Sequence, residues 1–194
     1  MQEIHHLVDG QAKPGTSGNT APVFNPATGE QTGQIGLASI KEVDQAVASS
    51  KAAFQEWGTA SVARRTKLLY NFRNLVEANA DEIARRLTAE HGKVGDDARG
   101  EVARGIENIE FACGVADALK GTHTEHASTG VDVYSVRQPL GVCAGITPFN
   151  FPAMVPMWMY PVAIACGNTF VLKPSEKDPS CPMRLGELAR SEER

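Results

Sequence analysis

The spacing of apolar residues predicts helices over much of the first two thirds of the chain. Apolar positions recur at helical intervals over about 40–57, 62–91 and 97–119, as expected of helices with one buried face. Ser39 and Glu42 form a capping-box pattern before the first helix, and a break in the second is expected near Asn79. The predicted apolar face of the first helix consists of Val43, Ala46, Val47, Phe54 and Trp57.

Other segments have the pattern of strands. Two short runs at 21–24 and 30–37 lie between turn-rich segments. In residues 131–138 the side chains Val131, Val133, Ser135 and Arg137 alternate with Asp132, Tyr134, Val136 and Gln138, which indicates a strand. Residues 140–146 form a continuous run of small apolar residues, which predicts a strand buried on both faces. An apolar helix over about 153–165, a buried strand over 169–172 and a last helix from near Cys181 complete the pattern.

Strand, helix and strand joined by short loops form a βαβ unit, whose strands should be parallel with a right-handed crossover. The sequence therefore predicts an α/β protein with a helical layer supplied by its first half. Ligands of such sheets bind beyond the carboxyl ends of the strands. Those ends are 147–150 and 173–176, so the two most unusual polar clusters of the chain are expected at the same edge of one sheet.

Composition narrows the class of protein. Hydrophobic residues make up 42% of the 194 residues and charged residues 22%, with a net charge of −4, which is ordinary for a globular domain. No basic tract favours nucleic acid. The longest apolar stretch, 149–166, is interrupted by prolines, which favours a buried helix over a membrane span. No leader pattern is evident, and four widely spaced cysteines suggest a reduced, cytoplasmic protein.

The two polar clusters each allow a functional and a structural interpretation. Lys173 and Glu176 could bind ribose hydroxyls or a phosphate, or they could be solvated charges in a surface turn. Asn150 lies between two phenylalanines before a proline. Its carboxamide could stabilise an oxyanion where water is excluded, or Asn150 could simply be a turn or N-cap residue.

Two further groups are weaker candidates. Arg104 could bind a substrate carboxylate through its planar guanidinium, or it could pair with Glu101, Glu107 or Asn108 on a solvated helix face. His123 and His126 form an H-x-x-H pattern in a loop, but a metal needs a third ligand and none is suggested nearby. No metal site is therefore predicted.

A combination of motifs in the second half resembles the aldehyde dehydrogenase superfamily. The residues are LGVCAGITPFNFP at 140–152, GNT at 167–169 and KPSE at 173–176. The TPFNFP form, followed by MVPMWM at 154–159, resembles in particular the methylmalonate-semialdehyde dehydrogenases that make an acyl-CoA, as does GIENIEF at 105–111. The likeness covers nearly the whole chain, up to about Ala189.

The resemblance implies roles for individual residues. Asn150 would donate to the thiohemiacetal oxyanion, and Arg104 would bind the carboxylate of a malonate-type semialdehyde. The residues implied to bind NAD are Thr147 and Phe149 beside the nicotinamide, and Lys173, Glu176 and Lys177 at the adenosine ribose.

The resemblance also implies a reaction. A cysteine thiolate attacks the aldehyde, hydride passes to NAD, and the resulting thioester is transferred to CoA with loss of the carboxylate. That cysteine would lie beyond residue 194, and none of the four cysteines here matches its motif. The chain alone is therefore expected to be inactive.

The implied fold is the first half of an aldehyde-dehydrogenase-type NAD-binding domain, truncated. Residues 1–130 would form its N-terminal strands and helical layer, 131–139 an oligomerisation-type strand and 140–194 the first βαβ of the cofactor domain, with the catalytic domain absent. The full-length enzyme would be a homo-oligomer. The segment 190–194 departs from the family pattern because the helix carrying Met183, Leu185 and Leu188 turns polar there, which suggests a truncation or an altered reading frame.

Two alternatives stay open. The chain could be a non-catalytic truncated subunit that assembles with a full-length enzyme. It could also represent another aldehyde dehydrogenase branch, such as a succinate-semialdehyde dehydrogenase.

Overall fold

The N-terminal 36 residues form two small sheets in the computed structural model, which describes residues 1–191. Strand β5 (Gln31–Gly36) pairs antiparallel with β4 (Thr20–Phe24) and parallel with β1 (Gln2–Ile4). The other sheet is the pair β2 (His6–Val8) and β3 (Gln11–Lys13). The predicted runs at 21–24 and 30–37 are thus strands. Strands β1 to β3 were missed because three residues are too few to show a period.

Four helices follow, and they confirm the helical layer. They are α1 (Ile40–Trp57), α2 (Val62–Ala78), α3 (Ala80–His91) and α4 (Gly95–Cys113). The expected break near Asn79 is present, and the Asn79 carboxamide donates to the Leu75 carbonyl at 2.8 Å. Helix α4 ends six residues before the predicted position of 119, because Gly114 terminates it and turns occupy the following residues.

Helix α1 begins as predicted but is less buried than its pattern suggests. The hydroxyl of Ser39 accepts the Glu42 backbone N–H, and the Glu42 carboxylate accepts the Ser39 backbone N–H, which completes the capping box. None of the α1 side chains is fully buried, and Val43 and Val47 are exposed. Trp57 anchors the far end, where its indole N–H donates to the Ile164 carbonyl at 3.1 Å.

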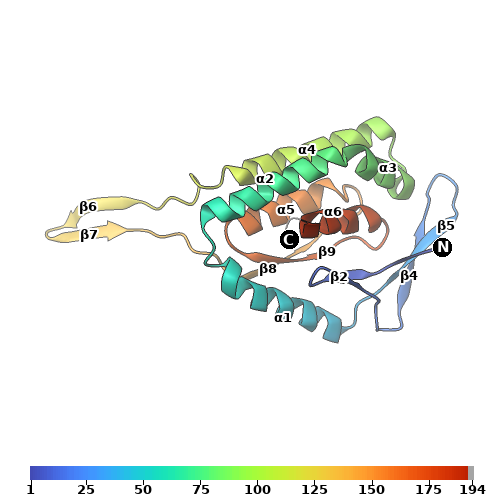
Figure 1. Cartoon of the computed structure of the whole chain (residues 1–194), viewed down its shortest axis with the longest axis horizontal. Helices are drawn as coiled ribbons and strands as arrows, with labels where there is room; N and C mark the ends of the chain where they lie inside the picture. Colours follow the sequence, from blue (N-terminus) through green and yellow to red (C-terminus); the bar gives the residue numbers. More distant parts are fainter. Residues whose placement is uncertain (192–194) are drawn as a thin grey trace.

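A β-hairpin extends away from the rest of the molecule (Figure 1). Strand β7 (Val131–Tyr134) is shorter than the predicted 131–138, and it pairs with β6 (His123–Ser128), a segment expected to be a loop. Every residue of both strands is exposed. The hairpin lacks a buried face, so its first strand carries no apolar alternation from which it could be predicted.

The second half contains the predicted βαβ unit. Strands β8 (Val142–Ile146) and β9 (Thr169–Lys173) are parallel and joined by α5 (Met154–Ala165), and α6 (Ser180–Ser191) follows. The sheet lies between α1 on one side and α5 on the other (Figure 1). The prediction that the first of these strands is buried on both faces is wrong, because Ile146 in β8 is 77% exposed. Only two strands pair in this sheet within residues 1–191, so both of its edges are open.

The main hydrophobic core lies between the helical layer and the βαβ unit. Its largest fully buried side chains include Leu69, Phe72, Ile83, Leu87, Ile109, Met157 and Leu185. These residues come from α2 to α6, so the core fixes α5, and with it the loop before α5, against the helical layer. Among residues 1–191, no helix combines the length and the hydropathy that a membrane crossing requires. The polar tail at 192–194 lies outside the described residues.

Candidate functional site at the edge of the parallel sheet

The carboxyl ends of β8 and β9 lie side by side, as the βαβ pattern predicts. Ile146 is in register with Lys173, and the Thr147 backbone N–H donates to the Lys173 carbonyl at 3.1 Å. Beyond this point, the ammonium group of Lys177 lies 4.4 Å from the centre of the Phe149 ring, within the range of a cation–π contact. The two predicted polar clusters therefore meet at one edge of the sheet.

Lys173 and Glu176 face each other across the turn that follows β9. Their ammonium and carboxylate groups are 2.8 Å apart, and both side chains are about half exposed. The hydrogen bond from Lys173 lowers the pKa of the Glu176 carboxyl. The pair thus presents a donor and an ionised acceptor to solvent, which is the chemistry needed to bind a diol such as a ribose.

Thr147 is the buried member of this edge. The residue is 4% exposed, and its hydroxyl oxygen has no hydrogen-bond partner among residues 1–191. Burying a hydroxyl without a partner is costly. A bound polar group at this edge would give the hydroxyl a partner.

Asn150 is neither an N-cap nor a buried turn residue. It is exposed, in a bend between Thr147 and the first turn of α5, and the N-cap position of α5 is Ala153. The backbone carbonyl of Asn150 accepts from the Lys93 ammonium at 3.1 Å. Its carboxamide makes no hydrogen bond to the described part of the chain, which leaves it free to bind a ligand.

Lys93 and Glu101 were missed as site residues by sequence reasoning, which placed Glu101 on a solvated helix face. The two side chains form an ion pair, with exposures of 9% and 1%. Glu101 lies among the buried positions of α4, which include Ala98, Val102 and Gly105. An acidic residue within the apolar stripe of a helix is the signal that could have identified it.

Arg104 lies one turn beyond Glu101 on α4 and is exposed. The carboxamide of Asn108 donates to the backbone carbonyl of Arg104 at 2.8 Å. Glu101, one of its suggested partners, is paired with Lys93 instead. The Arg104 guanidinium forms no ion pair within residues 1–191, so the predicted surface pairing is absent.

The cysteines lie in packed elements. Burial raises the pKa of the Cys113, Cys166 and Cys181 thiols. A raised pKa reduces the thiolate fraction and hence the reactivity. Within the described chain, no three His, Cys, Asp or Glu residues are grouped in a way that could hold a metal ion.

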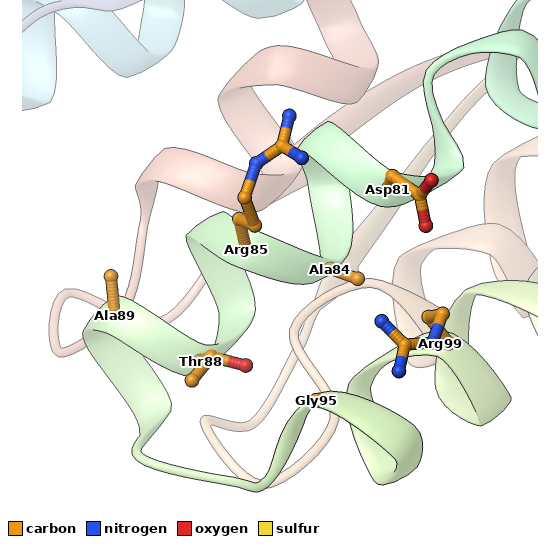
Figure 2. Close-up of a pocket in the computed structure, with 7 residues that line it drawn as sticks. All are labelled: Asp81, Ala84, Arg85, Thr88, Ala89, Gly95 and Arg99. Carbon is orange, nitrogen blue, oxygen red and sulfur yellow. The ribbon is translucent and has the colours of Figure 1, made fainter.

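A pocket of about 460 Å³ lies elsewhere, between α3 and α4. Figure 2 shows Arg85 from α3 and Arg99 from α4 at its rim, with Asp81 nearby. None of the residues predicted to form the site lines this pocket. The sheet edge and this pocket are therefore separate features of the surface.

Comparison with known proteins agrees with the geometry. The chain is 48% identical over 188 residues to the malonate-semialdehyde dehydrogenase of Pseudomonas aeruginosa. The matched region covers 97% of this chain and 38% of that protein. The methylmalonate-semialdehyde dehydrogenase of Oceanimonas doudoroffii has a similar structure, with a TM-score of 0.96 and 48% identity over 99% of this chain and 39% of that one. A Sinorhizobium meliloti 1021 protein solved in complex with NAD gives a TM-score of 0.97 and 49% identity, with the same coverage.

The chain therefore spans less than two fifths of the length of these relatives. The family described as "Aldehyde dehydrogenase family" matches residues 13–192, which is most of the chain. The likeness in sequence, together with the parallel βαβ unit and its polar edge, places this chain in the aldehyde dehydrogenase family.

Proposed function

We propose that this chain carries part of the cofactor site and the oxyanion donor of an NAD-dependent enzyme that oxidises malonate or methylmalonate semialdehyde to an acyl-CoA. The observation that carries the proposal is the meeting of Thr147–Asn150 and Lys173–Lys177 at one edge of a parallel sheet. Ligands of such sheets bind at that edge. The names of the relatives in Pseudomonas and Oceanimonas support the substrate class.

The residues at the edge fit NAD. Lys173 and Glu176 supply a donor and an acceptor for the adenosine ribose, and Lys177 adds a positive charge beside them. Thr147 and Phe149 would line the nicotinamide, where the Thr147 hydroxyl lacks a partner. When bound, NAD supplies the hydride acceptor of the reaction. The NAD complex of the Sinorhizobium relative supports this assignment.

Asn150 would stabilise negative charge on the substrate oxygen. Addition of a thiolate to an aldehyde converts the carbonyl oxygen to an oxyanion, and a carboxamide N–H held in place beforehand favours that state. The Asn150 carboxamide is free of partners in the described chain and lies at the same edge as the proposed nicotinamide contacts. Arg104 would bind the substrate carboxylate, and its guanidinium is likewise unpaired within residues 1–191.

The proposed cofactor site can be tested by binding alone. We expect Lys173→Met to weaken NAD binding by the 194-residue chain about 10-fold or more, because a hydrogen bond to a charged group contributes about 1.5–3 kcal/mol. Titration calorimetry would measure the dissociation constants. Lys120→Met is the matched control, since Lys120 also forms an exposed pair with an acid three residues away, Asp117. Equal affinities of Lys173→Met and the unaltered chain would contradict the assignment.

We also expect the chain alone to produce no NADH. No cysteine in it matches the nucleophile motif, and burial raises the pKa of Cys113, Cys166 and Cys181. NADH absorbance would be followed with NAD, CoA and methylmalonate semialdehyde, and with succinate semialdehyde as the competing substrate class. A CoA-dependent signal that accompanies the chain through purification would show that one of its own cysteines is reactive, contrary to this expectation.

The hairpin supports a second function, assembly with other subunits. Its exposed side chains include the apolar residues Val131, Val133 and Tyr134, and it projects from the body of the molecule (Figure 1). An exposed strand edge with apolar side chains is a template for pairing with another chain. A non-catalytic subunit that joins a full-length enzyme through β7 would use this surface.

A further inference from the structure

The ion pair between Lys93 and Glu101 lies beneath the loop that carries Asn150. Lys93 belongs to the connection between α3 and α4, and Glu101 is in the second turn of α4. Both side chains are almost fully removed from solvent. Buried charges need hydrogen-bond partners in addition to each other, and here those partners belong to the segment 150–154.

Glu101 caps a helix to which it does not belong. One of its carboxylate oxygens, Oε1, accepts the backbone N–H groups of Ala153 and Met154 at 2.8 and 3.0 Å. Helix α5 has no side-chain cap of its own, because its N-cap residue is Ala153. The first N–H groups of a helix lack partners within the helix, and they favour a negative charge. Glu101 therefore fixes the point where the loop enters α5.

Lys93 fixes the same loop closer to Asn150. Its ammonium donates to the Asn150 carbonyl at 3.1 Å and lies 4.7 Å from the centre of the Phe151 ring. At the other end of the loop, the Thr147 N–H is bonded to the Lys173 carbonyl of β9. The backbone around Asn150 is thus held on both sides and at Asn150 itself.

We propose that Lys93 and Glu101 are positioning residues that hold Asn150 in place for oxyanion stabilisation. The proposal rests on the proposed role of Asn150. A donor that is held in place before the reaction needs no reorganisation when charge develops, so its fixation increases its effect. The positive and negative charges offset each other, so the pair supports the loop without leaving a net charge beneath it.

The alternative role for this pair is to attach α4 to α5 without any effect on Asn150. Amide NMR spectra and hydrogen exchange of the 194-residue chain separate the two roles. The double variant Lys93→Met/Glu101→Leu removes both charges and preserves apolar packing, so it avoids leaving one buried charge unpaired. The matched control is Lys120→Met, which breaks an exposed lysine pair. Within residues 1–191, the hydrogen bonds and the ion pair of Lys120 are with Asp117 and Arg137, and none is with the loop.

In the double variant we expect the Ala153 and Met154 amides to exchange at least about tenfold faster, because they lose a charged acceptor. The backbone and carboxamide signals of Asn150 should shift and broaden, while those of Cys143 to Gly145 in β8 stay in place. The single variant Lys93→Arg keeps the charge and the donors. Its Asn150 signals should therefore lie close to those of the unaltered chain. Lys120→Met should change none of these signals.

Two results would overturn the proposal. If Ala153 and Met154 exchange faster but the Asn150 carboxamide signals do not move, the pair only caps α5. If the exchange of both amides is unchanged, Glu101 does not hold the helix start. Neither measurement uses NAD or substrate. A failure here is therefore distinguishable from a failure of the cofactor assignment, which Lys173→Met tests by NAD binding.

Discussion

Asp178 is a carboxyl group placed where ionisation is unfavourable. The residue is 3% exposed, and one carboxyl oxygen has no hydrogen-bond partner among the described residues. Burial raises its pKa to about 7. The nearby charges of Glu90 and Glu101 also raise this pKa, whereas a hydrogen bond with Ser175 lowers it. Burial raises the pKa of Glu90 as well. Asp178 and Glu90 lie near the start of α6, where Glu90 accepts hydrogen bonds from Ser180.

The raised pKa of Asp178 predicts a loss of stability with rising pH. An aspartate in an unfolded chain has a pKa of about 3.9. Between about pH 4 and 7 the folded state therefore retains a proton that the unfolded state has released. The stabilisation from this group is therefore complete below about pH 4 and is lost as the pH rises through about 7. We expect Asp178→Asn to gain stability relative to the unaltered chain by roughly 2–4 kcal/mol between pH 4 and 8, since one pKa unit corresponds to about 1.4 kcal/mol.

Urea unfolding at a series of pH values would measure this difference. Asp44→Asn provides the control, because it makes the same replacement at an exposed residue of α1. If the free energies of unfolding of Asp178→Asn and the unaltered chain have the same pH dependence, Asp178 has the same pKa in the folded and unfolded states, contrary to this prediction.

At the scale of elements, α4 determines where the site loop can lie. It packs against α5 so closely that an added Cβ at Gly105 would overlap the end of the Met157 side chain. Met157 is fully buried in the main core. Gly100 lies on the same helix but faces open space, with no atom within 4 Å of an added Cβ.

Gly100 and Gly105 are therefore expected to respond oppositely to alanine. Gly105→Ala should lower the free energy of unfolding by about 1–3 kcal/mol, the usual cost of overpacking a core. Gly100→Ala should raise it by about 0.5–1 kcal/mol, because alanine is the better helix former. Urea unfolding midpoints would measure both changes in stability. Stabilisation by both substitutions would contradict the close packing of α4 against Met157.

At the scale of the molecule, the described chain combines a well-packed helical layer with surfaces that lack a cover. Both edges of the β8–β9 sheet are open, Ile146 and Trp158 are exposed, and the hairpin projects into solvent. Open strand edges and exposed apolar side chains favour association. The hairpin is the part that projects furthest (Figure 1).

We expect the chain to sediment at micromolar concentration with a mass above the 20.8 kDa of one copy. Val133→Glu should shift it toward the single-copy mass, because a charge on β7 opposes strand pairing with another chain. Val94→Glu is the control, since Val94 is similarly exposed but lies outside the hairpin. A single species of one-copy mass for the unaltered chain would count against assembly through β7.

The sequence predicted the parts of the fold that depend on local periodicity. Helices α1 to α3, strands β4 and β5, and the parallel βαβ unit all follow from apolar spacing and caps, with boundaries close to those observed. It failed where pairing across the chain decides the structure. Strand β1 depends on β5, and β6 depends on β7. Neither has enough residues with a buried face to show a pattern by itself.

The sequence likewise predicted only part of the candidate site. The chain order of strand, loop and strand was enough to bring Thr147–Asn150 and Lys173–Glu176 to one edge, because parallel strands end together. The contact of Lys177 with Phe149 and the support of the loop by Lys93 and Glu101 were decided only by tertiary structure. Lys93 and Glu101 are separated from that loop by about fifty residues, and only the packing of α4 against α5 brings the Ala153 and Met154 N–H groups to the buried carboxylate of Glu101.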